Sequence, residues 1–355
     1  MVDKNLLYNF DVILNDCVKL TKKINVDLLK NKTILITGSN GLIGGFLSDF
    51  CCFLNDNFDA KINIYLTSYS DVNNAERIKH IINRDDVKYF SWDCSTKIDT
   101  NNLSEKIDII FFCSGYGQPA KFLENKIKTA LINVVGLESL LKVMYQTGGG
   151  DFLFLSTSEI YGNPPDDMLP TPETYGGLYD LKNNRAVYNV SKTMGEVICK
   201  EYDQFDSMNI KIARVALTYG PGALKSDTRV LQEFIFKASR GGQINMFDEG
   251  SSIRNYLYIV DSIEILINCL FLGKYLVYNV GGDTEPVSIY ELAKKIGEII
   301  GAPVYKGKSK VEFTKTAPKN VGLDMRRFRK EFLNYGNDLI NLEDGINNVI
   351  KWYNI

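Results

Sequence analysis

The sequence predicts an α/β fold, in which a doubly wound parallel sheet is joined to a smaller, mixed C-terminal domain. Short apolar runs typical of buried strands alternate with longer segments of helical periodicity along most of the chain. A glycine-rich turn joins the first strand to the helix that follows it. A Tyr and a Lys four residues apart follow a later strand. Strands that alternate with helices indicate crossover connections and therefore a parallel sheet.

Composition limits the possible partners. The 355 residues carry a net charge of -2 and give a pI of about 5.7, so no overall basic field favours nucleic acid. No apolar run is long enough to span a bilayer and no signal-peptide pattern opens the chain, so we expect a cytoplasmic protein without a membrane partner. The single histidine, His80, and seven scattered cysteines predict neither a metal site nor a disulfide framework.

Residues 1–30 are predicted to form an N-terminal helical arm. Their apolar positions recur near the helical period and form one stripe: Leu6, Leu7, Phe10, Ile13, Leu14, Val18 and Leu20. Such a stripe either packs against the main domain, which we favour, or forms a dimer contact.

The first strand, residues 33–36, leads into a glycine-rich loop and then a helix. Glycines at this spacing let the backbone turn tightly, approach a pyrophosphate and pack helix on strand, while the helix N-terminus offers N–H groups to phosphates. We therefore expect a Rossmann-type dinucleotide site, formed here by Gly38, Asn40, Gly41, Leu42, Ile43 and Gly44.

The second strand, residues 62–66, ends in Thr67 and Ser68, where an acidic residue usually holds the ribose 2′-hydroxyl. This departure leaves NAD and NADP both open, with NAD preferred. Asp71 is a substitute ligand for the ribose, and Arg77 is a candidate for a 2′-phosphate.

Two further strands add cofactor candidates. Asp93 follows the strand at residues 87–90 and is expected near the adenine. Ser114 and Gly115 follow the strand at residues 107–113, where small residues allow the backbone to pass close to the cofactor. Gln118, in the same loop, is a candidate for contact with the substrate.

The strand at residues 151–155 leads to Thr157, Ser158 and Glu159, at the edge where open α/β sheets bind ligands. Tyr188 and Lys192 lie one turn apart on one face of a helix predicted for residues 185–202. A neighbouring ammonium stabilises a phenolate and lowers its pKa, so the pair forms a candidate general base for an alcohol that loses hydride. Thr157 is expected to orient that alcohol.

The C-terminal third is less regular. A strand at residues 275–281 is expected to return to the main sheet, and helices are expected at 288–300 and 342–353. Arg229 and Arg254 are candidates for a diphosphate, which suits forked guanidinium donors. We expect residues 31–215 with 256–281 to form the cofactor domain, and residues 216–255 with 282–355 to form the substrate domain.

Five motifs, in order along the chain, resemble those of the extended short-chain dehydrogenase/reductase family, in its branch of nucleotide-sugar epimerases, dehydratases and UDP-glucuronate decarboxylases. The resemblance runs from about Lys32 to the C-terminus. The motifs are Thr37-Gly38-x-x-Gly41-x-x-Gly44, Ser156-Thr157-Ser158-Glu159-x-Tyr161-Gly162, Tyr188-x-x-x-Lys192, Arg214-x-x-x-x-Tyr219-Gly220-Pro221 and Arg254-x-Tyr256-x-Tyr258-x-x-Asp261.

This resemblance implies a tightly held NAD that removes hydride from C4 of a sugar joined to a nucleoside diphosphate. It implies that Tyr188 is the base, that Lys192 lowers its pKa and binds the nicotinamide ribose, and that Thr157 holds the sugar hydroxyl. It also implies a homodimer joined through the helices that include the Tyr-Lys one, and a role in polysaccharide biosynthesis.

The net reaction is less specified by the resemblance. Thr157-Ser158-Glu159 is similar to the decarboxylases, and Glu159 is a candidate for a second proton transfer at C5. The family's arginine near a C-terminal proline is replaced by Thr316, beside Lys315, and Leu217 stands where the family usually has Asn. We therefore place epimerisation slightly ahead of UDP-glucuronate decarboxylation. A 4,6-dehydratase, a 4-keto reductase or dehydrogenase, and a non-catalytic cofactor-binding protein are the further alternatives.

Overall fold

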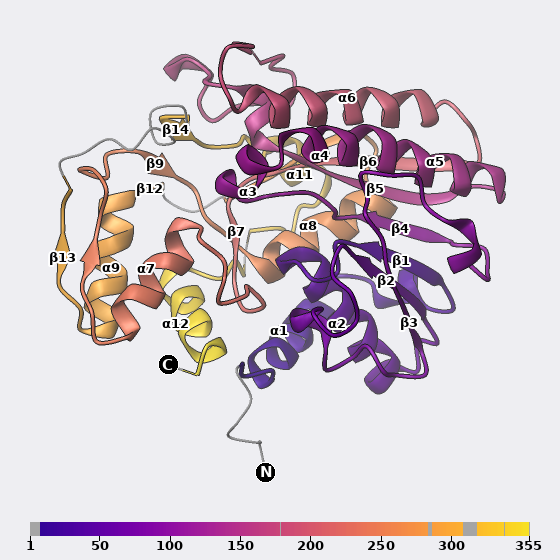
Figure 1. Cartoon of the computed structure of the whole chain (residues 1–355), viewed down its shortest axis with the longest axis horizontal. Coiled ribbons are helices and arrows are strands. Elements are labelled where there is room, and N and C mark those ends of the chain that lie inside the picture. Colours follow the sequence, from indigo (N-terminus) through magenta and orange to yellow (C-terminus); the bar gives the residue numbers. More distant parts are fainter. Residues whose placement is uncertain (1–7, 178, 283–285, 308–317, 337, 355) are drawn as a thin grey trace.

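A computed structural model describes residues 8–177, 179–282, 286–307, 318–336 and 338–354. Within these residues, seven parallel strands form the central sheet, in the order β11-β6-β5-β4-β1-β2-β3 (Figure 1). Their bounds are β1 Thr33–Thr37, β2 Asn63–Ser68, β3 Val87–Ser91, β4 Ile109–Phe112, β5 Gly150–Thr157, β6 Met208–Val215 and β11 Val277–Val280. The strand order reverses between β1 and β4. In open α/β sheets, ligands bind at such a switch point, at the carboxyl ends of the strands.

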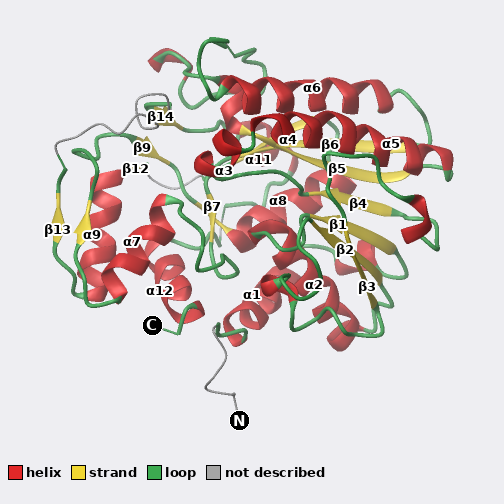
Figure 2. Ribbon diagram, in the orientation of Figure 1, coloured by secondary structure: helices red, strands yellow, loops and turns green. Residues whose placement is uncertain are grey.

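Helices cover both faces of the sheet, as Figure 2 shows. One face carries α1, α2 and α8, and the other carries α4, α5 and α6, which enclose two separate apolar clusters. All residues of β1 and β4 are buried, because helices pack above and below them. The covering helices are α1 Asp11–Thr21, α2 Leu42–Phe58, α8 Ile259–Leu272, α4 Lys126–Leu131, α5 Leu137–Gln146 and α6 Ala186–Tyr202. The predicted doubly wound α/β fold is confirmed.

Between α4 and α5 lies a π-helical turn, η4 Ile132–Gly136, although the sequence pattern predicts one helix from Lys128 to Tyr145. The Asn133 amide nitrogen donates to Ser191 Oγ on α6 at 3.0 Å. A Cβ at Gly136 would lie 2.0 Å from the carbonyl oxygen of Cys94, so only glycine fits this close approach. The local widening therefore serves the packing of this helix against its neighbours.

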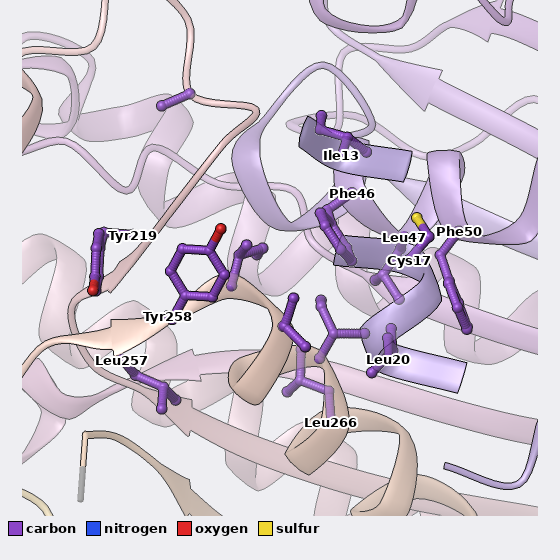
Figure 3. Close-up of a cluster of buried hydrophobic side chains, with 14 of the residues drawn as sticks. Ile13, Cys17, Leu20, Phe46, Leu47, Phe50, Tyr219, Leu257, Tyr258 and Leu266 are labelled. Carbon is purple, nitrogen blue, oxygen red and sulfur yellow. The ribbon is translucent and has the colours of Figure 1, made fainter. Parts of the chain in front are cut away.

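The N-terminal arm packs against the main domain through α1 and the short 3-10 helix η1 Val26–Leu29. Ile13, Cys17 and Leu20 are buried in the same apolar cluster as Phe46 and Phe50 of α2 (Figure 3). The favoured packing role is therefore seen.

The smaller C-terminal part contains two- and three-stranded sheets and four helices among the described residues. β7 Thr218–Tyr219 pairs with β10 Leu257–Tyr258, and β9 Ile253–Arg254 lies between β12 Val287–Ser288 and β14 Asn320–Val321. The remaining elements are β8 Ile244–Asn245, β13 Val304–Tyr305, α7 Val230–Ser239, α9 Ile289–Ile300, α11 Arg326–Glu331 and α12 Leu342–Trp352. In the described part of the chain, no helix has the length and apolar character needed to cross a membrane.

Candidate active site

Thr157 is the last residue of β5 and the N-cap of the 3-10 helix η5 Ser158–Tyr161. Its hydroxyl oxygen accepts a hydrogen bond from the backbone N–H of Glu159 at 3.2 Å. The Thr157 side chain also lies close enough to the phenol of Tyr188 to lower its pKa. The end of β5 and the first turns of α6 therefore bring the two predicted side chains together.

Tyr188 is buried, with 8% of the residue exposed. Its ring stacks on Phe122 of α3 Pro119–Glu124, with centroids 4.7 Å apart and 3° between the planes. One turn further along α6, Lys192 Nζ donates to the carbonyl oxygen of Leu155 at 2.6 Å and lies over the ring of Phe154. Stacking fixes the direction of the phenol, and the carbonyl contact fixes the ammonium at the floor of the site.

Burial controls the protonation of both groups. It raises the pKa of Tyr188 to about 12, and the negative charge of Glu159 adds to this, while Thr157 and Arg185 act in the opposite direction. Burial also lowers the pKa of Lys192 to about 8. The effect of Lys192 on the phenol stays a prediction, and burial of the phenolate opposes it.

Glu159 forms an ion pair with Arg185, the N-cap residue of α6. Arg185 Nε donates to one carboxylate oxygen at 3.1 Å and its terminal nitrogen donates to the other. Ser158 and Glu159 line a narrow hollow of about 10 Å³ that also contacts Asn320. Asn320 Oδ1 is buried and has no hydrogen-bond partner among the described residues, so this hollow presents an acceptor beside η5.

The glycine loop has the geometry that a dinucleotide requires. Gly38 has φ +63°, and a Cβ there would lie 2.7 Å from the Cys113 carbonyl oxygen. A Cβ at Gly44 would lie 2.5 Å from the Gly38 carbonyl oxygen. Gly41 caps α2, and in the described chain no side chain occupies the N–H groups of this helix end. Leu42 and Ile43 open the helix, so their N–H groups fit a pyrophosphate.

The end of β2 also fits the cofactor. Thr67 Oγ1 is buried without a hydrogen-bond partner among the described residues, whereas the Ser68 hydroxyl bonds the Tyr89 phenol at 2.8 Å. The Asn40 side chain donates to Ser70 Oγ and accepts from the backbone N–H of Arg77. Because Thr67 is 0% exposed, its hydroxyl is buried in this structure, and the contact of Thr67 and Ser68 with the ribose stays a prediction.

Asp71 and Arg77, the two candidates for contact with the ribose or a 2′-phosphate, have other partners in the structure. The Asp71 carboxylate accepts from the backbone of Asn73 and from both the backbone and side chain of Asn74, closing its own turn. Arg77 is fully buried and pairs with Asp49 of α2. Its guanidinium is therefore unavailable to a 2′-phosphate.

The remaining cofactor candidates lie at the ends of β3 and β4. Asp93 accepts from Ser95 and pairs with Lys128 Nζ at 2.8 Å. The backbone N–H of Ser114 donates to Thr37 Oγ1. A Cβ at Gly115 would lie 3.6 Å from Lys192 Nζ, so this loop passes directly over the lysine.

The substrate candidates already have protein partners. The Arg229 fork is paired with Asp227, and another nitrogen donates to the Thr218 carbonyl. Gln118 Oε1 accepts from the hydroxyl of Thr228, one residue before Arg229. These contacts bring Gln118 and Arg229 to one side of the site.

The Arg254 side chain binds backbone carbonyl oxygens, so its donors already have partners. Its guanidinium donates to the carbonyl oxygens of Ile253, Pro318 and Lys319, and burial lowers its pKa. It therefore fixes the chain that follows Thr316 and Lys315, which lie outside the described residues.

Sequence reasoning missed three features of the site: Arg185, Phe122 and Glu196. Arg185 stands three residues before Tyr188, a helical spacing that could have identified it. Glu196, one turn after Lys192, accepts from Ser156 Oγ and forms a forked pair with Arg214. These pairs join α6 to β5 and β6 below the reacting groups.

Leu217, at the position where the family usually has Asn, has φ +45°. This left-handed conformation suits Asn better than Leu. Leu therefore replaces Asn at this position, while the backbone keeps a conformation that is typical of Asn.

The sequence is similar to those of known UDP-glucuronic acid decarboxylases. UDP-glucuronic acid decarboxylase 1 of Xenopus tropicalis is 25% identical over 323 residues, which cover 91% of this chain and 72% of the relative. UDP-glucuronic acid decarboxylase 3 of Arabidopsis thaliana is 28% identical over 274 residues, 77% of this chain and 76% of the relative.

Solved structures show the same fold. An epimerase of Methanothermobacter thermautotrophicus superposes with a TM-score of 0.77 at 18% identity, covering 98% of this chain and 96% of that one. UDP-glucuronic acid 4-epimerase of Bacillus cereus, solved with UDP-glucuronic acid and NAD, gives 0.73 at 21%, covering 91% and 99%. The model of the NAD dependent epimerase/dehydratase family matches residues 34–281, well over half of the chain. The protein, with its glycine loop and its Thr157, Tyr188 and Lys192 site, belongs to the NAD-dependent epimerase/dehydratase family.

Proposed function

We propose that this protein oxidises C4 of a nucleoside diphosphate sugar and that its substrate is UDP-glucuronate. The observation that carries the first part is the contact of Thr157 with Tyr188, with Lys192 one turn further along α6, at the carboxyl edge of the sheet beside the glycine loop. The substrate assignment is supported by the decarboxylase relatives.

The chain's own residues divide the work. The Thr157 hydroxyl orients the C4 alcohol, and Tyr188 takes its proton as the C4–H bond breaks. Bound NAD would supply the acceptor for the hydride. Lys192 would favour the phenolate, against the effect of burial. The N–H groups of the glycine loop and the start of α2 bind the pyrophosphate.

We propose decarboxylation as the net reaction. Once C4 is a ketone, the C6 carboxylate of UDP-glucuronate is β to a carbonyl, so the C5–C6 bond can break with release of CO₂. The electron pair passes into a C4–C5 enolate, C5 takes a proton, and the hydride returns to C4. The similarity to decarboxylases supports this order of the two reactions, whereas the sequence analysis placed epimerisation slightly ahead.

Epimerisation is the second candidate, and one observation favours it. The Glu159 carboxylate, the candidate for a second proton transfer, is held by Arg185 through both oxygens. A 4-epimerase transfers no proton at C5, so it does not need a free Glu159 carboxylate.

Incubation of the purified protein with UDP-glucuronate, followed by mass spectrometry and chromatography, separates the candidates. Decarboxylation gives a product lighter by CO₂, whereas epimerisation gives an isomer of unchanged mass. A panel of UDP-, GDP-, CDP- and dTDP-sugars tests the substrate assignment. Failure of every sugar to give either a product or a transient rise in absorbance at 340 nm would contradict C4 oxidation.

A further inference from the structure

The wall of the site beside Tyr188 contains a second pair of charges that C4 oxidation does not itself require. Arg185 and Glu159 come from different elements, α6 and η5, and are joined by a forked ion pair. The Arg185 side chain is 5% exposed and that of Glu159 is 20% exposed. A pair so shielded from water acts on its neighbours far more strongly than a surface pair.

Phe122 connects this pair to the base. The Arg185 guanidinium carbon lies 5.1 Å from the centre of the Phe122 ring, and the same ring stacks on Tyr188 at 4.7 Å. Phe122 itself is 1% exposed, so it has little freedom to move. The position of Arg185 is thereby tied to the position of the Tyr188 ring.

We propose that Arg185 is a positioning residue that anchors the Glu159 carboxylate beside Tyr188 and balances its charge, so that Glu159 acts as a fixed anion. This inference rests on the proposed function, since it assigns a task to groups around the proposed base. The opposite charges of the pair act on the phenol in opposite directions.

Other charged groups around the pair are placed differently. Lys192 is directed at the Leu155 carbonyl, and Arg254 of β9 is occupied by backbone carbonyls. Both members of the pair act on the pKa of Arg254, which Glu159 raises and Arg185 lowers. Arg185 is thus the cation that meets the Glu159 carboxylate directly.

The test uses the holoenzyme and four variants: Arg185→Gln, Glu159→Gln, the double variant, and Arg185→Lys. The readout is the pH dependence of NADH formation in a single turnover with UDP-glucuronate. Glu159→Gln removes an anion, so the midpoint should move to lower pH by about 0.5 to 1 unit. Arg185→Gln removes a cation and should move it to higher pH by a similar amount. The double variant should return close to the parent value.

Two control variants distinguish an effect of the charge pair on the midpoint from a loss of the folded structure. Arg185→Lys keeps the charge and loses the fork, so its midpoint should stay near that of the parent protein while the rate falls. Arg84→Gln breaks a forked pair with Asp56, at the β3 side of the molecule. This variant should change neither the midpoint nor the rate. Shifts of the two single variants in the same direction, or an unchanged midpoint in Arg185→Gln, would overturn the proposal.

A second measurement does not require turnover. Nuclear magnetic resonance of protein labelled with ¹³C in the tyrosine rings follows the Tyr188 phenol, identified by its loss in Tyr188→Phe. The same opposite shifts are expected in this titration. If no nucleotide sugar reduces NAD but these shifts occur, the proposed function fails and the role of the ion pair stands. If NADH forms but the titrations do not shift, the proposed function stands and the role of the ion pair fails.

Discussion

Tyr188 is the residue on which the proposed chemistry depends, and its surroundings predict how the rate varies with pH. Burial raises its pKa, so the phenol must lose a proton that it holds firmly at neutral pH. We expect the single-turnover rate of NADH formation to rise about tenfold per pH unit below the pKa of Tyr188 in the complex, and then to level off. A rate that falls with rising pH across this range would argue against a phenolate base.

Replacing Tyr188 with Phe tests the same group directly. The ring can still stack on Phe122, so fold and NAD binding should persist while C4 oxidation falls by at least about 10²-fold to 10⁴-fold. Retained NAD, measured in the denatured protein, is the control. Turnover close to that of the parent protein would refute the mechanism.

Leu217 gives a prediction about stability. Its left-handed backbone costs a non-glycine residue about 1 to 2 kcal/mol, and Asn tolerates this conformation better. Leu217→Asn should therefore raise the free energy of unfolding by about 0.5 to 1 kcal/mol, measured by urea titration. The neighbouring Ala216→Gly is a suitable control and should destabilise the protein.

At the scale of elements, the sequence located the strands and helices that form the site to within a few residues. The β5 strand, the α6 helix and the glycine loop have strong local signals, namely apolar runs, helical spacing and glycines. The η4 turn was missed because it depends on the approach of Gly136 to Cys94, which no local pattern reveals. The two-residue strands of the C-terminal part are too short to show a period. The Arg185 and Glu159 pair joins residues 26 apart, so it required the folded chain.

The loop from Gly38 to Gly44 separates cofactor binding from folding. Gly41→Ala places a methyl group 3.1 Å from one carbonyl oxygen at the mouth of the pyrophosphate site, so NAD should be lost while the fold persists. Gly44→Ala places one 2.5 Å from the Gly38 carbonyl, and should cost about 1 to 3 kcal/mol of unfolding free energy. NAD content and thermal unfolding of both variants check this, and equal stability of the two would contradict it.

At the scale of the whole molecule, the outer surface of α4 and α6 predicts self-association. Its exposed apolar side chains form a stripe on two helices that pack side by side: Ile127, Leu131, Val190, Met194 and Val197. A stripe of this kind on a surface helix pair is typical of an interface. The homodimer implied by the resemblance would cover it, and both the dimer and the expected cytoplasmic location stay predictions.

Met194→Glu tests the dimer, because it places a charge at a position that is 49% exposed in the single chain. Light scattering should show a dimer for the parent protein and a monomer, or at least a tenfold weaker dimer, for the variant. Leu14→Glu on the outer side of α1 is a matched control, since Leu14 is also 49% exposed. Dissociation by the control instead would assign the interface to the arm.

The packing of the arm also determines when it can fold. Tyr258 donates to Asp16 of α1 at 2.5 Å, and the backbone N–H of Asn9 donates to the carbonyl of Trp352. Tyr258 lies 242 residues after Asp16, and Trp352 lies 343 residues after Asn9 (352 minus 9). At about 5 to 20 residues per second, the arm leaves the ribosome some tens of seconds before its partners exist. The apolar contacts of α1 with α2 can therefore form early, whereas its hydrogen bonds to Tyr258 and its neighbour's bond to Trp352 must wait for distant parts of the chain.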